Sequence, residues 1–167
     1  MTTITRVSIG GEDLALANVT YSVRITHGRS TVTDWPQSAT CDLVLYGNVR
    51  MPELSEPVIV EAYGQPRFTG LVSDLEPSTD PATGRRFIIV SCTGPVADLA
   101  LATVTPSSWP QETSGARAAR ILAAAGITAY RTSGDFEVLS QTSDPANALD
   151  LLGTLASSTG AAVYSAP

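Results

Sequence analysis

The sequence predicts a mainly β protein that closes with an α+β segment. Apolar and polar residues alternate from the start of the chain to about Val104, as they do in strands with one buried face. Turn-forming residues separate these runs, and after Pro106 the apolar spacing changes to that of helices. A hydrophobic content of 43% with 16% charged residues is typical of a globular chain.

The clearest strand covers residues 19–26, where Val19, Tyr21, Val23 and Ile25 share one face. An earlier hairpin is expected around Gly10 and Gly11. Further strands are expected, in order along the chain, at residues 39–47, 57–64, 67–77 and 85–94. Five or six antiparallel strands at this spacing predict a closed or nearly closed barrel, or a sandwich.

Two helices are expected in the last third of the chain. Residues 113–126 have Thr113 or Ser114 as a capping residue and end at Gly126. Residues 143–160 form the second predicted helix, with Asp144 as its cap. Short strands are expected between the helices at residues 127–131 and 136–140.

The change of pattern predicts two domains. Residues 1–105 form a β-barrel, and residues 106–167 form an α+β segment. Residues 161–167 begin another strand that has no partner after it. We therefore expect the α+β segment to be the start of a second domain that continues beyond Pro167.

The charge of the chain argues against several classes of function. The net charge is -6, and all ten basic residues are arginines that lie scattered along the sequence. Without lysine there is no phosphate-loop lysine and no Schiff base. Nucleic acids and anionic membranes both favour a clustered basic surface. No apolar run approaches the roughly 20 residues of a membrane helix, and the N-terminus does not resemble a secretory signal, so we expect folding in a cytoplasm.

No catalytic, cofactor-binding or metal-binding site is predicted. His27 is the only histidine and lies at a strand end, which favours a surface turn residue over a catalytic base. Cys41 and Cys92 fall within predicted strands, where cysteines are usually small buried side chains. A disulfide between neighbouring strands is the alternative.

Acidic and aromatic residues give the remaining candidates. Asp74, Glu76 and Asp80 form the densest acidic stretch, but they enter a proline-rich loop, where carboxylates usually form turns. Trp35 and Trp109 lie beside prolines in predicted loops. These two tryptophans are the candidate contact residues for a partner, and covering one end of the barrel is the alternative role.

Several stretches resemble the N-terminal part of phage tail baseplate hub, or minor tail, proteins of long-tailed phages. Residues 23–45 resemble the family's strand, Gly-Arg turn, polar loop and second strand, and RFTGLVSDLEP (67–77) resembles its F-x-G-x-V-x-D strand. SCTGPVADLALATV (91–104) is similar to the step that leaves the barrel. Residues 113–127 and 161–167 resemble its helical continuation, so the resemblance covers nearly the whole chain.

This resemblance implies a tail-tube-like barrel that assembles with copies of itself into a ring, typically a trimer. The ring would lie on the tail axis of the virion, connect the tail tube to distal tail and tip or fibre proteins, and line the exit path of DNA. Assembly would take place in the host bacterial cytoplasm, with no cofactor, no membrane binding and no enzymatic activity. The alternatives are a carbohydrate- or receptor-binding β module of a tail tip, a cell-wall hydrolase with paired carboxylates, and the hub of a contractile injection or secretion spike.

Overall fold

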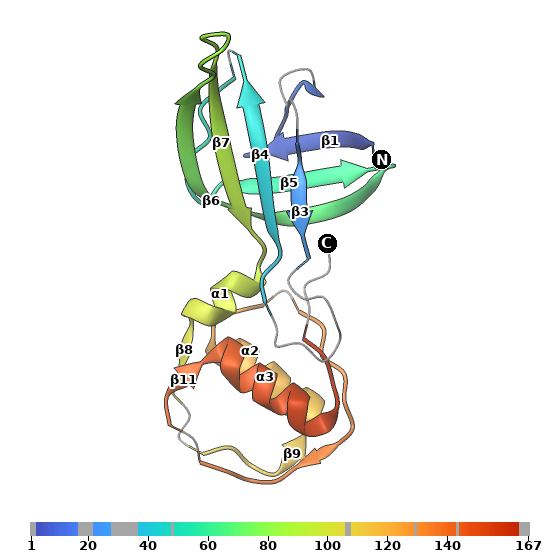
Figure 1. Cartoon of the computed structure of the whole chain (residues 1–167). Coiled ribbons are helices and arrows are strands. Elements are labelled where there is room, and N and C mark those ends of the chain that lie inside the picture. Colours follow the sequence, from blue (N-terminus) through green and yellow to red (C-terminus); the bar gives the residue numbers. More distant parts are fainter. Residues whose placement is uncertain are drawn as a thin grey trace. The chain divides into compact units, whose positions relative to one another are not determined.

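The computed structural model describes residues 3–16, 22–27, 37–47, 49–105, 108–128, 130–142 and 144–163. These residues form two compact units that divide between Pro95 and Val96, and each unit has its own hydrophobic core (Figure 1). No helix in these ranges is both long and apolar enough to cross a bilayer. The domain boundary at residues 105 and 106 stays a prediction.

The first unit is a seven-stranded antiparallel sheet with the strand order β2-β1-β5-β6-β7-β4-β3. The strands are, in chain order, β1 (Ile4–Ile9), β2 (Glu12–Asp13), β3 (Arg24–Thr26), β4 (Thr40–Tyr46), β5 (Pro57–Ala62), β6 (Gln65–Thr79) and β7 (Arg86–Thr93). The β1–β2 hairpin with Gly10 and Gly11 at its turn is confirmed. The strands expected at 39–47, 57–64, 67–77 and 85–94 are confirmed within a few residues.

The core of this unit lies on one face of the sheet because its strands alternate as predicted. Along β4, for example, Cys41, Leu43 and Leu45 are buried while the residues between them are only half-buried. Side chains from five strands meet in one cluster, which contains Val7, Ile9, Cys41, Leu43, Leu45, Val58, Val60, Phe68, Val72, Val90 and Cys92. The sheet must therefore curve around this cluster, and β1 and β5 cross the direction of β4 and β7 in Figure 1.

Strand β6 makes the curve possible by changing its partner. Its first half pairs with β5 and its second half with β7, and Leu71 is opposite both Pro57 and Thr93. Gly70 lies at this changeover, where an added Cβ would come within 2.3 Å of the Thr93 carbonyl oxygen. The F-x-G-x-V-x-D pattern thus places Phe68 and Val72 in the core on either side of a position that only glycine fits.

The predicted closed barrel is not found in the described part of the chain. The sheet ends at β2 and β3, and no pairing joins these two strands. β2 has two residues and pairs with β1, and β3 has three residues and pairs with β4. The strand predicted for residues 19–26 is confirmed for Arg24–Thr26, whereas Ser22 and Val23 form no strand and residues 19–21 lie outside the described ranges.

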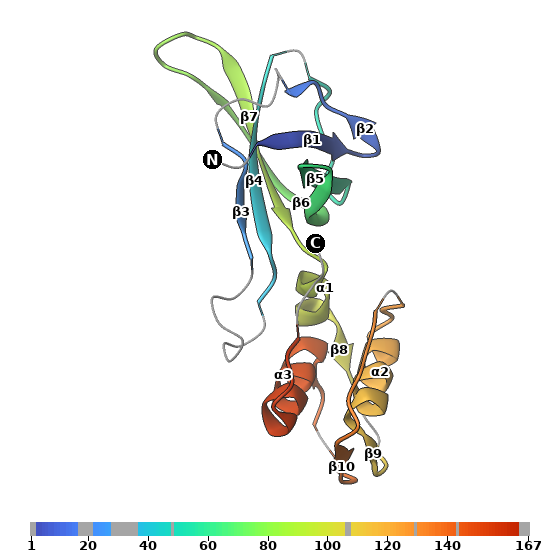
Figure 2. The same cartoon turned by 90° about the vertical axis from the view of Figure 1, so that its right-hand side faces the viewer.

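The second unit packs helices on a narrow antiparallel ribbon (Figure 2). Its elements are α1 (Val96–Leu101), β8 (Thr103–Val104), β9 (Glu112–Thr113), α2 (Ser114–Ala124), β10 (Glu137–Val138), β11 (Ala146–Asn147) and α3 (Ala148–Thr159). β8 pairs with β11, β9 pairs with β10, and an isolated bridge joins Trp109 to Gln141 between them. All these pairs keep one register, so the segments on either side of α2 form a single interrupted ribbon.

The predicted helix at residues 113–126 is confirmed as α2, and the second predicted helix begins later than expected. Thr113 caps α2 by accepting a hydrogen bond from the Ala116 N–H at 3.3 Å. α3 begins at Ala148 and is capped by Asn147, whereas Asp144 was the predicted cap. The reason is tertiary, because pairing of Ala146 and Asn147 with β8 holds these residues extended.

The remaining short strands differ in part from the expectation. β10 confirms the strand at 136–140, but the described residues of 127–131 and 161–163 form no strand. Helix α1 was not predicted. It has six residues, and its two buried residues, Val96 and Leu99, form a single apolar pair, from which a helical period cannot be recognised.

Candidate functional site

The most elaborate polar arrangement in the described residues surrounds Arg117 in the second unit. Arg117 lies on α2 four residues before Ile121, so both side chains face the core, and the side chain of Arg117 is only 2% exposed. Its Nε donates to Glu112 Oε1 at 2.8 Å. Its Nη2 donates to the carbonyl oxygens of Pro110 at 2.7 Å and Leu139 at 3.2 Å.

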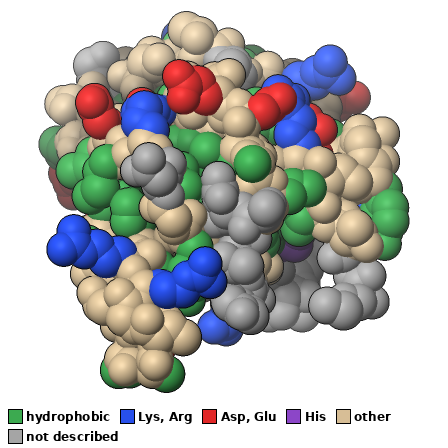
Figure 3. Space-filling model, turned by 90° about the horizontal axis from the view of Figure 1, so that it is seen from above, with side chains coloured by type: hydrophobic (Ala, Val, Ile, Leu, Met, Phe, Trp, Pro, Cys, Tyr) green, Lys and Arg blue, Asp and Glu red, His purple; other side chains and the backbone are tan. Residues whose placement is uncertain are grey.

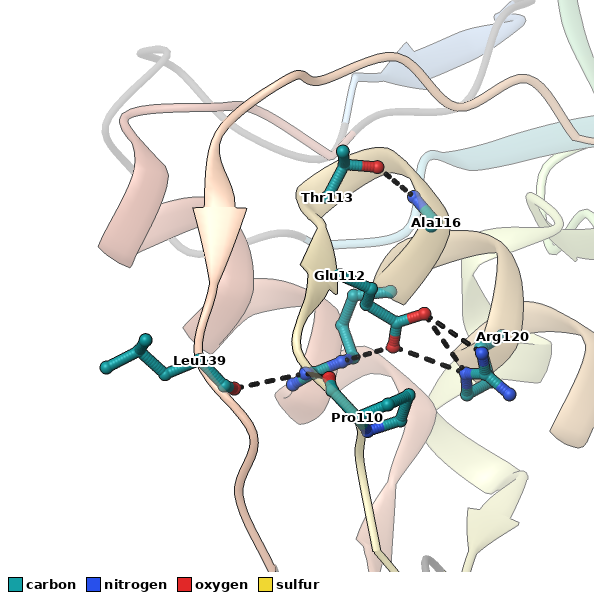
Figure 4. Close-up of polar contacts among 7 residues, drawn as sticks. Pro110, Glu112, Thr113, Ala116, Arg120 and Leu139 are labelled. Carbon is teal, nitrogen blue, oxygen red and sulfur yellow. Dashed lines mark hydrogen bonds and ion pairs between the residues drawn. The ribbon is translucent and has the colours of Figure 1, made fainter.

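These bonds replace part of the ribbon ladder. Pro110 has no N–H and interrupts the pairing between the Trp109 bridge and β9. The carbonyl groups of Pro110, shortly before β9, and Leu139, directly after β10, both accept from Arg117 (Figure 4). The guanidinium group therefore ties α2 to both strands at the point where they do not pair with each other.

Trp109 and Arg120 complete the arrangement. The Arg117 guanidinium carbon lies 5.3 Å from the centroid of the Trp109 ring, within the range of a cation–π contact. Arg120 also pairs with Glu112, with Nη2 3.0 Å from Oε2, but its side chain is 53% exposed. Hydrogen bonds from Arg120 and Arg117 lower the pKa of Glu112 against the opposing effect of burial. Arg117 Nη1 is buried and makes no hydrogen bond within the described structure.

This chemistry is that of a structural junction. A general acid or base needs a group that changes protonation near its working pH, whereas Glu112 is held ionised between two arginines. Sequence reasoning missed Arg117 and Glu112. The available signal was the charge at position 117 on the same helix face as Ile121, where an apolar residue is usual.

The two candidate contact residues have different outcomes. Trp109 is 4% exposed and belongs to the core of the second unit, so the structure gives it a packing role. Its role in contact with a partner stays a prediction. Trp35 lies outside the described residues.

The acidic candidates do not converge. Asp80 accepts from the Ala82 N–H at 2.9 Å and from the Thr83 hydroxyl at 2.6 Å. These bonds, with that of Thr83 first, lower the pKa of Asp80, which is the behaviour of a turn residue and opposite to that of a general acid. Asp74 and Glu76 are exposed along β6. The structure does not gather these three carboxylates into a site.

The other candidate chemistry is equally sparse. His27 is exposed immediately after β3. The described ranges contain no group of three or more histidine, cysteine or acidic side chains placed to hold a metal ion. Cys41 and Cys92 are buried and unbridged, and they lie opposite each other on β4 and β7.

Two arginines of the sheet unit meet opposite charges. Arg6 pairs with Asp13 at 2.8 Å and with Glu61 at 3.0 Å across β1, β2 and β5. Arg50 pairs with Glu56 at 2.9 Å. Figure 3 shows acidic and basic side chains next to one another at several places on one face of the molecule. Such a surface favours specific contacts over the binding of a polyanion.

Comparison with known proteins gives structural relatives only. No protein-family model and no curated protein matches the sequence. The fold matches the crystal structure of a 43 kDa tail protein of prophage MuSo2 from Shewanella oneidensis, with a TM-score of 0.63 and 18% identity, over 93% of this chain and 49% of that one. It also matches the tail protein from Neisseria meningitidis MC58, with a TM-score of 0.67 and 15% identity, over 97% of this chain and 47% of that one. The chain thus spans about half the length of two tail proteins whose fold it shares.

Proposed function

We propose that this chain is a structural component of a phage tail, a baseplate hub or minor tail protein. It forms a ring, a trimer, on the tail axis, connects the tail tube to the tip proteins and lines the exit path of DNA. The observation that carries the proposal is the fold likeness to two tail proteins over 93% and 97% of the chain. A likeness that spans both units and their connection is more informative than one limited to a common sheet.

The sequence motif at the sheet corner adds support. Phe68, Gly70 and Val72 belong to the pattern through which the chain resembles tail hubs, and they form the changeover of β6 from β5 to β7. The motif therefore corresponds to a structural requirement of this fold. That correspondence makes an accidental match of short motifs a poorer explanation.

The face of the sheet opposite the core is suited to contact with DNA in passage. Asp42 alternates with the buried Cys41 and Leu43, so it lies on this outer face of β4 opposite Arg24 of β3. Asp74 and Glu76 are exposed on β6, which gives this face three carboxylates beside that arginine. Carboxylates repel the phosphate backbone, which favours passage over retention. We therefore assign this face to the lumen of the proposed ring.

The rival functions find less support in the described residues. A carbohydrate-binding module would gather exposed aromatic side chains on one face, as tip modules that stack on sugar rings do. Here the most exposed aromatic residues are Tyr63 in the sheet unit and Tyr130 and Phe136 in the other unit, so they do not share one sheet face. A cell-wall hydrolase would need Asp74, Glu76 or Asp80 in a cleft, whereas Asp74 and Glu76 are exposed and Asp80 is bonded within its own turn. We propose a protein without enzymatic activity.

Immunogold labelling of purified particles tests the proposal directly. Antibodies raised against this chain should label one end of the tail, and the protein should be detected by mass spectrometry in particles purified through two gradients. Label along contractile spikes that carry no capsid would instead indicate a component of an injection or secretion machine. Absence of the protein from all such particles would refute a tail role.

Light scattering after size exclusion tests the ring. A discrete trimer that persists on dilution supports assembly through this chain. A strict monomer over a wide concentration range, together with no binding to the tail-tube protein in a pull-down, would refute the ring. A matched variant with Asp42→Asn and Asp74→Asn should keep the oligomeric state, since the proposal places these carboxylates in the lumen.

A further inference from the structure

Cys41 and Cys92 lie directly opposite each other on the neighbouring strands β4 and β7. The register of β4 and β7 pairs Cys41 with Cys92, between the pairs Thr40–Thr93 and Asp42–Ser91. Their exposed fractions are 0% and 1%, and both belong to the core cluster. Both side chains therefore leave the sheet on the same face, as neighbours.

The ladder also fixes how far apart their backbones are. The Gly94 N–H donates to the Ala39 carbonyl oxygen at 2.8 Å, and these residues lie two positions beyond the cysteines on each strand. Because hydrogen-bonded and non-hydrogen-bonded pairs alternate, Cys41 and Cys92 form a hydrogen-bonded pair, for which the Cα separation is about 5.5 Å. Disulfides span Cα separations of about 4.4–6.8 Å, so the backbone spacing of this pair lies within their range. Their Cβ separation of about 3.5–4.5 Å is shorter than the roughly 5 Å or more of a hydrogen-bonded pair, so the two strands must move slightly closer for a bridge to form.

We propose that Cys41 and Cys92 are a reversible redox site that closes into a disulfide across β4 and β7. Closure takes place by exchange with a small-molecule disulfide such as oxidised glutathione. One cysteine thiolate attacks the glutathione disulfide and releases one glutathione thiolate; the second cysteine then attacks the mixed disulfide and releases the other. Two protein thiols are oxidised, one glutathione disulfide is reduced to two thiols, and the two protons pass to the released thiolates.

The position of the bridge determines what it would do. β7 lies between β6 and β4, so a bridge from β7 to β4 joins two neighbouring strands of the sheet, and the loop it closes contains β5 and β6. Such a bridge restricts the unfolded chain and stabilises the sheet. The inference rests on the sheet register alone and does not depend on the role proposed in the tail.

Burial makes the site slow to react. Removal from water raises the pKa of Cys41, with a smaller contribution from Cys92, and raises the pKa of Cys92 to about 12. Exchange requires a thiolate, so little of the reactive form is present in the closed sheet at neutral pH. We therefore expect both thiols to stay reduced during brief exposure to oxidant, and the disulfide to form only during prolonged exposure.

The test is equilibration of the purified chain with reduced and oxidised glutathione at several ratios, for days, below the melting temperature. Free thiols are then trapped with iodoacetamide in denaturant and counted by intact-mass spectrometry. We expect a monomeric species two hydrogens lighter that takes up no alkyl group, has an unchanged circular dichroism spectrum, and melts several degrees higher. Cys41→Ala and Cys92→Ala variants provide matched controls, since each retains one alkylated thiol.

Three outcomes would overturn the inference. The first is that both thiols stay free, and are therefore both alkylated by iodoacetamide, even after the chain is unfolded and refolded in buffer that contains oxidised glutathione alone. The second is that only mixed disulfides with glutathione form. The third is an oxidised monomer that has lost the circular dichroism of the sheet, which would mean that the bridge does not fit the native register. All three use the wild-type chain and do not require that the alanine variants fold.

Discussion

Replacement of Arg117 by methionine is the sharpest test of the junction in the second unit. Methionine keeps the apolar stem of the buried side chain and removes the guanidinium group. The change breaks the bond to Glu112 at 2.8 Å and the bonds to the Pro110 and Leu139 carbonyl oxygens. We expect the second unit to lose stability while the sheet unit is unaffected.

The magnitude follows from opposing contributions. Removal of one partner from a buried ion pair costs about 3–5 kcal/mol. The lower end applies here because Glu112 keeps its pairing with Arg120. Arg117 Nη1 is buried without a hydrogen bond in the described structure, and such a donor destabilises the folded state by about 1–3 kcal/mol. Its removal therefore offsets part of the loss. We therefore expect the free energy of unfolding to fall by about 2–3 kcal/mol.

The assay is urea denaturation followed by tryptophan fluorescence in a Trp35→Phe background. Trp109 is then the single tryptophan, and it lies in the core of the unit under test. Arg120→Met is the matched control, because Arg120 also pairs with Glu112 from α2 but is 53% exposed. Its effect should be much smaller. Equal effects of the two substitutions, or a loss below about 1 kcal/mol for Arg117→Met, would refute the argument from burial.

Three further predictions follow from particular contacts. Gly70→Ala should lower the stability of the sheet unit by about 1–3 kcal/mol or more in thermal unfolding, since the new Cβ would lie 2.3 Å from a main-chain oxygen. Substitution of the neighbouring, exposed Thr69 by alanine should cost far less. Equal costs of the two substitutions would contradict the role of Gly70 at the changeover of β6. Asn147→Ala should lower the free energy of unfolding by about 1 kcal/mol through loss of the α3 cap. Asp144→Ala should leave it nearly unchanged. The reverse order of the two effects would mean that Asp144 caps the helix. Because the folded-state pKa of Glu112 is lowered, its contribution to stability is complete above its unfolded pKa of about 4.3 and is lost as pH falls through the folded value. Denaturant midpoints between pH 7 and pH 3 should therefore fall more steeply for the wild type than for Glu112→Gln, and parallel curves would argue against this.

Local patterns were sufficient where a residue's burial follows from alternation or helical spacing. The strands β4 to β7 and the helix α2 could be predicted because each buries one continuous face, and Cys41, Leu43 and Leu45 follow from position along a strand. Turn residues set the ends of these elements within a few positions. The same local logic gave Thr113 as one of two candidate caps of α2, the other being Ser114.

Long-range pairing decided the rest. Nothing near Asp144 in the sequence shows that Ala146 and Asn147 pair with β8 and so delay the start of α3. The sequence places Arg117 on the helix face of Ile121, but nothing near it in the sequence shows that the carbonyl oxygens of Pro110 and Leu139 accept its hydrogen bonds.

The sequence by itself therefore determined the positions of β1, β2, β4 to β7 and α2 within a few residues, and that the chain is mainly β. Only the tertiary structure decided that the sheet stays open among the described strands, that β6 is shared between β5 and β7, and that Cys41 meets Cys92. The physical reason is that alternation fixes which face of a strand is buried, while strand order and register depend on partners far away in the chain.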